Sequence, residues 1–338
     1  MSTPCTRIVV VDPERPAPEA VALAAQRLAD GEAIALPTET VYGLAADARD
    51  PLATARIFEA KSRPRFDPLI VHLLDASWLE RVAVVADADR SLVSALARAF
   101  WPGPLTLVLP RTDVVPDLVC AGLPTVAVRV SAHPVFRAVQ AAFGGPIAAP
   151  SANRFGRISP TRGADVIAEL DGRIPLVLDA GPTAHGLEST IVRPSAGRLV
   201  VMRHGPVTDR DLAAFAPVDL APPGNGLAPE APGRLLSHYA PETPVLLVEP
   251  GDRFEPRDGV HCALLAWDRT IPEAPFARIL RLSERGDLRE AAANLFAALR
   301  ELDRGGLDVI VAQAVPDEGI GVAINDRLRR AAARGRPA

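Results

Sequence analysis

Apolar runs of strand length alternate with helical patterns through residues 1–215 of this 338-residue chain. The runs are rich in Val, Ile, Leu and Ala, which is typical of buried strands. They lie at residues 8–11, 33–36, 69–71, 105–109, 126–128, 147–149, 176–178, 190–192 and 199–201. Apolar residues at helical spacing predict helices over residues 18–29, 91–100 and 134–143. This alternation predicts an α/β domain built around one sheet.

Residues 216–243 differ, because they are too rich in Pro and Gly for a regular element. We interpret them as a linker or a functional lid. Residues 244–338 then resume the strand and helix patterns. Strands are predicted at residues 245–248, 262–265, 278–280 and 309–311, and helices at residues 288–302 and 323–333. This order predicts a smaller, Rossmann-like α/β domain with a parallel sheet.

Composition and charge narrow the class of protein. Apolar residues at 48% and charged residues at 23% describe an ordinary globular protein. A formal charge of -4 argues against a broad basic surface for nucleic acid, but it leaves a small anionic ligand open. The three cysteines are far apart, so we expect no structural metal site. No apolar run reaches the length of a signal peptide or a membrane span, so we expect a cytoplasmic protein without membrane contact.

Lys61 is the only lysine among 37 basic residues, all the others being Arg. Lys carries a compact ammonium, whereas Arg carries a planar fork, so a site that holds one small cation against a phosphate would resist the exchange. The alternative is a solvated lysine that survived by chance. Arg63 and Arg65 follow at once, and three cations this close favour anions around them. We interpret the cluster as a phosphate clamp.

Other polar residues follow or lie within the predicted strands, where ligand sites of α/β folds collect. Residues 37–40, 149–153 and 186–190 are turns of this kind. Small polar groups there can present N–H groups to an anion, or they can cap the helix that is predicted after Thr161. Arg129 lies inside an apolar strand and needs an anion, which a ligand or a protein carboxylate would supply. His72 also lies in a strand, where a lone His is more often a core residue than a catalyst.

These segments together resemble the threonylcarbamoyl-AMP synthase family in its two-domain form. The resemblance rests on residues 37–44, 61–64, 67–72, 101–106, 149–153 and 187–192, in that order, and residues 238–241 and 324–328 extend it. It implies a YrdC-like N-terminal domain with a twisted open mixed sheet, followed by the linker and the Rossmann-like domain. The family condenses L-threonine, bicarbonate and ATP into threonylcarbamoyl-AMP and pyrophosphate, as a nucleotidyltransferase. Other proteins then transfer the threonylcarbamoyl group to tRNA.

The resemblance also implies roles for individual residues. The catalytic pair would be Lys61 and Arg63. The ATP site would comprise Lys61, Arg63, Asp67, Thr125, Asn153, Thr161, Arg203 and Tyr239. The threonine site would comprise Thr40, His72, Arg129, Ser151 and Ser189, with Arg129 on the carboxylate. A magnesium ion would accompany ATP, with no residue assigned as a metal ligand. Asp67 stands where the family commonly has Asn, and its charge needs a partner such as Arg63, Arg65 or a metal.

Two other functions remain open at this point. One is an enzyme of the same fold that makes carbamoyl-AMP from carbamoyl phosphate, although its known forms carry zinc-binding modules that need cysteine pairs. The other is a module that binds double-stranded RNA, which the acidic composition makes a weak binder.

Overall fold

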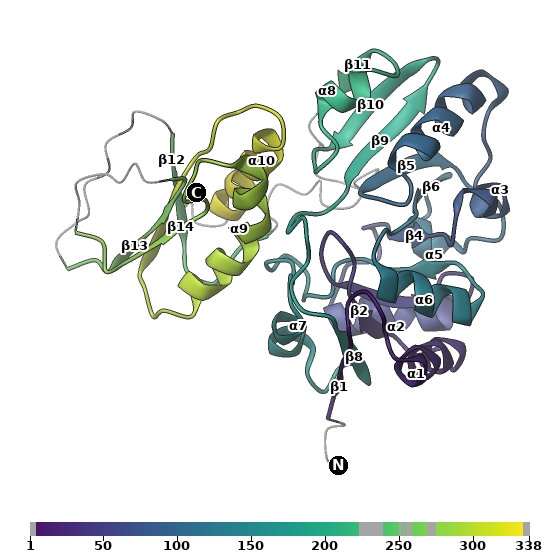
Figure 1. Cartoon of the computed structure of the whole chain (residues 1–338), viewed down its shortest axis with the longest axis horizontal. Helices are drawn as coiled ribbons and strands as arrows, with labels where there is room; N and C mark the ends of the chain where they lie inside the picture. Colours follow the sequence, from purple (N-terminus) through teal and green to yellow (C-terminus); the bar gives the residue numbers. More distant parts are fainter. Residues whose placement is uncertain are drawn as a thin grey trace.

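The computed structural model describes residues 5–222, 239–249, 252, 254, 259–268 and 275–333. Residues 223–238, which hold most of the predicted linker, lie outside this range. Figure 1 shows two α/β units, each with its own sheet. The α/β class and the two-unit organisation therefore agree with the sequence analysis, while the domain boundaries at residues 215 and 244 stay a prediction.

The larger sheet has 11 strands in the order β1-β8-β2-β3-β7-β4-β6-β5-β9-β10-β11, and it mixes parallel with antiparallel pairs. The strands are β1 (Arg7–Val10), β2 (Ile34–Leu36), β3 (Gly43–Asp47), β4 (Ile70–His72), β5 (Leu105–Pro110), β6 (Thr125–Arg129), β7 (Ile147–Ala148), β8 (Leu176–Asp179), β9 (Thr190–Ser195), β10 (Arg198–Arg203) and β11 (Val218–Leu220). The mixed sheet that the resemblance implied is confirmed.

Helices pack against this sheet: α1 (Pro18–Ala29), α2 (Pro51–Lys61), α3 (Leu79–Val82), α4 (Asp87–Phe100), α5 (Asp117–Cys120), α6 (Pro134–Phe143), α7 (Gly163–Leu170) and α8 (Asp209–Ala213). Helix α1 shows why these segments are helical. Pro18 sits in its first turn, where the missing N–H costs nothing. Ala20, Ala24 and Leu28 then recur every fourth residue and are buried, so one face of the helix packs on the core.

Two strands escaped the sequence analysis. Strand β3 follows a polar turn and is built of Gly and Ala with one Leu, residues of weak strand preference, yet it is buried between β2 and β7. Strand β11 lies inside the segment that we interpreted as linker, and it pairs with β10 at the edge of the sheet. An edge strand needs hydrogen bonds on one side only, so the neighbouring prolines do not prevent it.

The smaller unit has a four-stranded sheet in the order β12-β15-β13-β14, with every pair parallel as predicted. Its elements are β12 (Val245–Val248), β13 (Cys262–Ala266), β14 (Arg278–Arg281), α9 (Leu288–Asp303), β15 (Val309–Gln313) and α10 (Gly321–Ala332). Helices α9 and α10 lie on the side of this sheet that faces the larger unit (Figure 1).

The two units share a hydrophobic core. Leu295 and Leu299 of α9 are buried in one cluster with Val41, Ile158 and Leu187 of the larger unit. Because a shared apolar cluster removes surface of both units from water, it stabilises the docked arrangement. The docking also places helices α9 and α10 beside the polar turns of the larger unit.

Candidate functional site

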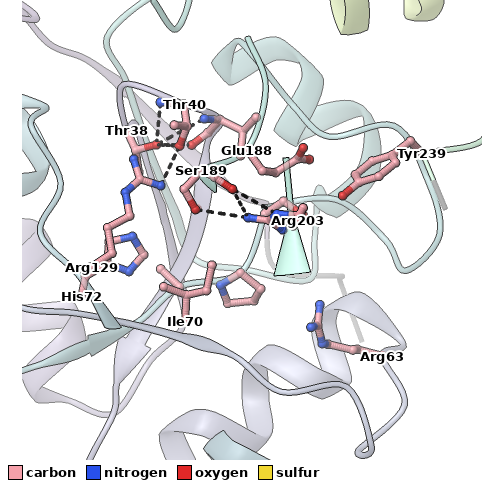
Figure 2. A pocket seen from close by; sticks show the side chains of 15 residues that line it. Thr38, Thr40, Arg63, Ile70, His72, Arg129, Glu188, Ser189, Arg203 and Tyr239 are labelled. Carbon is pink, nitrogen blue, oxygen red and sulfur yellow. Dashed lines mark hydrogen bonds between the residues drawn. The ribbon is translucent and has the colours of Figure 1, made fainter. Parts of the chain in front are cut away.

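A cavity in the larger unit gathers most of the residues that the sequence singled out (Figure 2). Eight of the predicted site residues line it: Thr40, Arg63, His72, Arg129, Ser151, Ser189, Arg203 and Tyr239. They come from turns and strand ends that are far apart in the sequence. In Figure 2 the side chains of Thr40, His72 and Arg129 lie at one end, and those of Arg63 and Tyr239 lie at the other.

Arg129 and His72 are brought together by the sheet. Strands β4 and β6 are parallel, and the last residue of each pairs in register, so His72 lies beside Arg129. Nη1 of Arg129 donates to Thr40 Oγ1 at 2.9 Å, and its Nη2 lies 2.6 Å from Glu39 Oε1. Of the two partners that the sequence left open for Arg129, a protein carboxylate is thus present. Arg129 is only 3% exposed, so this pairing removes the cost of a lone buried charge.

The charges at this end fix the protonation of their neighbours. Burial would raise the pKa of Glu39, but Arg129 and the hydroxyl of Ser131 lower it to about 2. Burial, assisted by the charge of Arg129, lowers the pKa of His72 to about 3, so its ring is neutral at pH 7. Nδ1 of His72 has no hydrogen-bond partner among the described residues. A buried ring nitrogen without a partner is what a ligand group would satisfy.

Ser189 occupies the middle of the cavity and is held on two sides. Its hydroxyl lies 2.8 Å from Thr106 Oγ1, and its carbonyl oxygen accepts hydrogen bonds from Nε and Nη2 of Arg203. Arg203, the last residue of β10, is itself 7% exposed. Its guanidinium therefore both fixes Ser189 and adds a positive charge to the cavity.

The end of helix α2 explains how Lys61 and Arg63 are placed. Lys61 is the last helical residue, and Ser62 takes the left-handed conformation at φ 51°, which stops the helix and turns the chain. Arg63 then donates from Nε and Nη2 to the carbonyl oxygens of Asp67 and Pro68. Its Nη2 also lies 2.9 Å from Asp67 Oδ2, so Arg63 is a partner for the charge of Asp67.

Lys61 is not among the residues that line this cavity. Its Nζ donates to the carbonyl oxygens of Ser151 and Asn153, and its side chain borders a separate cavity that is also lined by Arg154, Arg157 and Arg173. Burial, and then the charge of Arg63, hold the pKa of Lys61 well below its ordinary value. The only lysine is thus buried, so it is not a solvated residue that survived by chance.

Four further residues of the predicted ATP site also lie outside the cavity lining: Asp67, Thr125, Asn153 and Thr161. The side chain of Asn153 donates to the carbonyl oxygens of Arg154 and Arg157, so it shapes its own loop. Thr125 begins strand β6, roughly 13 Å along the strand from Arg129. No side chain among the described residues caps α7 at its N-cap, Arg162; instead Asp165 in the first turn of the helix accepts a hydrogen bond from Thr161 N.

Tyr239, near the end of the predicted linker, also lines the cavity. It is 1% exposed, and its ring stacks on Phe296 of α9 with centroids 5.5 Å apart. Its backbone has φ 62°, a conformation that costs free energy for any residue except glycine. The backbone N–H of the next residue, Ala240, donates to Gly156 O. The contacts with Phe296 of the smaller unit and Gly156 of the larger unit therefore hold this part of the chain in place.

The sequence analysis missed one acidic residue of the cavity, Glu188. Its carboxylate is 6% exposed, accepts a hydrogen bond from Ser159 Oγ and pairs with Arg327 Nε at 3.1 Å. Its position directly before Ser189, inside a segment that carried the resemblance, was the available signal.

The described residues contain no cluster of three or more His, Cys, Asp or Glu side chains with the proximity that a metal site needs. Nor does any helix in the described part of the chain combine the length and apolar character of a membrane span.

Comparison with known proteins identifies relatives over both units. Residues 26–205 match the family described as "Telomere recombination", and residues 207–333 match "Threonylcarbamoyl-AMP synthase, C-terminal domain". The threonylcarbamoyl-AMP synthase of Bacillus subtilis (strain 168) is 38% identical over 323 residues, covering 92% of each chain. That of Pyrococcus abyssi (strain GE5 / Orsay) is 38% identical over 336 residues, covering 92% of this chain and 93% of the relative.

A solved structure is similar over almost the whole length. The crystal structure of P. abyssi Sua5 complexed with L-threonine superposes with a TM-score of 0.87 at 36% identity, covering 97% of this chain and 98% of that one. The similarity includes the smaller unit, so it extends beyond the domain that carries the cavity.

Proposed function

This chain belongs to the threonylcarbamoyl-AMP synthase family, and we propose that its cavity condenses L-threonine, bicarbonate and ATP into threonylcarbamoyl-AMP and pyrophosphate. One observation carries the proposal: the cavity joins an end whose charges are balanced, at Arg129 and Glu39, to an end rich in buried cations, at Arg63 and Arg203. A zwitterionic amino acid suits the first end and a triphosphate suits the second.

At the balanced end, threonine would be held by Thr40, His72, Arg129, Ser151 and Ser189. Three of the five N–H groups of Arg129 face Gly103 O, Thr40 and Glu39. The others remain for the ligand carboxylate, with an orientation that Glu39 fixes in advance. The unpartnered Nδ1 of His72 would take part in a hydrogen bond with the ligand.

At the cationic end, Arg63 and Arg203 would face the phosphates of ATP, with Lys61 as the second member of the catalytic pair. Lys61 would exchange its carbonyl partners for phosphate oxygens, and a polyanion would favour its charged form. Tyr239 would cover the nucleotide, while Asp67, Thr125, Asn153 and Thr161 would border it. These assignments rest on the family resemblance and on the burial of the cations.

The reaction asks the protein for positioning more than for covalent chemistry. A carbamate of threonine is labile in water, and its oxygen must attack the α-phosphorus of ATP while pyrophosphate leaves. The buried cations would neutralise the charge that develops on the phosphate oxygens.

Magnesium would enter with ATP as part of the substrate. Both carboxylate oxygens of Glu188, the acidic residue that lines the cavity, already accept hydrogen bonds from Ser159 and Arg327. Phosphate oxygens and water would therefore hold the ion, which supplies further neutralisation of negative charge.

Pyrophosphate release by the purified full-length chain tests the proposal. We expect release from ATP only when threonine and bicarbonate are both present, together with a product that carries the mass of threonylcarbamoyl-AMP. Release that is independent of threonine would contradict the proposal.

Carbamoyl phosphate as a replacement for threonine and bicarbonate tests the carbamoyl-AMP alternative. A product of the proposed kind would next require proteins that transfer its threonylcarbamoyl group to tRNA. Weak, salt-dependent binding of double-stranded RNA without catalysis would favour the binding-module alternative.

A further inference from the structure

Arg327 of helix α10 is the largest of the fully buried side chains in the described residues. Its Nε donates to Glu188 Oε2 at 3.1 Å, its Nη1 to Asp326 Oδ2 at 2.9 Å and its Nη2 to His204 O at 3.0 Å. Its guanidinium carbon lies 5.1 Å from the centre of the Tyr239 ring. Two of these partners, Glu188 and Tyr239, line the cavity of the larger unit.

The loop that carries Glu188 and Ser189 is also confined by backbone. A side chain at Gly186, which has φ 68°, would place its Cβ 2.5 Å from Ala292 O of helix α9. On the other side, a Cβ at Gly205 would lie 2.5 Å from Thr190 N and 2.6 Å from Glu188 O. The loop is thus clamped between the smaller unit and the turn after β10, with no room for a different path.

We propose that Arg327 is a positioning residue of the cavity, through which the smaller unit fixes Glu188 and the ring of Tyr239 in their working places. The inference rests on the proposed function for its consequence in catalysis. Arg327 itself does not line the cavity, so it acts through these two neighbours. The smaller unit is accordingly a part of the site's construction.

Only an arginine can make this set of contacts. Its planar fork donates in three directions at once and presents a flat face to an aromatic ring, whereas an ammonium is a point charge on a flexible stem. Arg327→Lys therefore keeps the positive charge for Glu188 but loses the bridge to His204 and the stacked face. If the geometry matters, this conservative change should be nearly as harmful to turnover as Arg327→Met.

Arg300→Met provides the matched control. Arg300 of α9 is also a buried arginine between the units, since its Nη1 lies 3.2 Å from Glu169 Oε1 and its Nη2 donates to Ile158 O. None of these three residues lines the cavity. Loss of Arg300 should weaken docking of the smaller unit without moving Glu188 or Tyr239.

The experiment compares the full-length wild type with Arg327→Lys, Arg327→Met and Arg300→Met in steady-state kinetics, thermal unfolding and amide hydrogen exchange. We expect kcat/KM to fall on the order of 100-fold in both Arg327 variants, because a small misplacement of site groups has effects of that size. We expect no such fall in Arg300→Met at a similar loss in Tm. Residues 186–190 should exchange faster in the Arg327 variants than in Arg300→Met.

A double-mutant cycle completes the design. The effects of Arg327→Lys and Glu188→Gln on kcat/KM should be far from additive, while those of Arg300→Met and Glu188→Gln should add. Kinetics of Arg327→Lys that match Arg300→Met, or unchanged exchange in residues 186–190, would overturn the inference. If Arg327→Met does not fold, Arg327→Lys decides the matter. A wild type that forms no threonylcarbamoyl-AMP would refute the proposed function instead, and the exchange comparison would still test whether Arg327 holds the loop.

Discussion

The two ends of the cavity differ in how their buried charges are paired. At one end, Arg129 is paired with Glu39, whose second oxygen accepts from Ser131 Oγ, so the local charges cancel within the protein. At the other end, Lys61 donates to the carbonyl oxygens of Ser151 and Asn153, and Arg63 pairs with Asp67. The first end thus has a complete ion pair, whereas the second gathers three cations, Lys61, Arg63 and Arg203, around the carboxylate of Asp67.

The shifts in the pKa values of Glu39 and Lys61 agree with this difference. Glu39 is held ionised by Arg129, while Lys61 has its pKa lowered by burial and by Arg63. A group of cations in a low-dielectric interior favours a multiply charged anion, since each new contact offsets part of the free-energy cost of burying a charge. A complete pair favours a ligand of zero net charge, whose own charges can add to the network without unbalancing it. The comparison therefore predicts which substrate occupies which end.

Removal of Arg129 should disrupt the ion pair with Glu39 and cause the largest loss of free energy among these predictions. Arg129→Met leaves Glu39 as an uncompensated buried charge, so we expect a loss of about 3–5 kcal/mol in the free energy of unfolding, measured in urea. Arg129→Met combined with Glu39→Gln removes both charges and should recover most of that loss. Calorimetric titration of the double variant should show weakened threonine binding with ATP binding retained. Equal weakening of both ligands would mean that Arg129 only supports the fold.

Exchange of Lys61, the only lysine, should test whether the cationic end of the cavity depends on a compact ammonium. In Lys61→Arg the charge is kept, but a planar fork does not fit the space between the carbonyl oxygens of Ser151 and Asn153. We expect a loss of about 2–4 kcal/mol in transition-state stabilisation, read from kcat/KM for ATP. The exposed Arg65, exchanged for Lys, is the control and should change little. Normal turnover of Lys61→Arg would show that the cationic end does not depend on a compact ammonium.

Acid should destabilise the complete end through His72. Its pKa is about 6.5 in an unfolded chain and about 3 in the folded protein, so the folded state binds fewer protons below pH 6.5. Stability is thus full above pH 6.5 and falls as the pH drops toward 3. One such group contributes a loss of about 2 kcal/mol between pH 6.5 and 5. His72→Gln should flatten the pH dependence of urea unfolding in this range by that amount, whereas His261→Gln, at an exposed position, should leave it unchanged.

Most strands and the longer helices could be predicted from periodicity, but the pairing of charges could not. Helices α1 and α6 begin and end where the pattern placed them, because Pro and Gly mark their ends. Strand β3 was missed because its Gly and Ala carry no strand signal, and only its neighbours in the sheet make it a strand.

Residue types indicated the anion chemistry of the site, while partners far apart in the sequence were invisible. That Arg129 faces Glu39, 90 residues earlier, follows from the register of β4 and β6 and the turn after β2. That Lys61 points at the carbonyl oxygens of the loop at 151–153, rather than into the cavity, depends on where helix α2 stops. Glu188 was overlooked because its role comes from Arg327, which belongs to the other unit.

The smallest effect should come from a substitution of Asp67, whose carboxylate pairs with Arg63 at the cationic end. Asp67→Asn retains the carbonyl oxygens of residues 67 and 68 that accept from Arg63, so the fold around Arg63 should persist. The exchange removes a negative charge beside the expected phosphates. Burial already raises the pKa of Asp67 despite Arg63, so its charge is held at a cost that the variant relieves. We expect ATP to bind more tightly by about 1 kcal/mol, or roughly fivefold in KM, with no change for threonine. Asp219→Asn, which breaks an exposed pair with Arg198, is the control and should leave both constants unchanged. Weaker ATP binding by Asp67→Asn would mean that the carboxylate orients Arg63 for the nucleotide, and that the cationic end depends on this acidic residue.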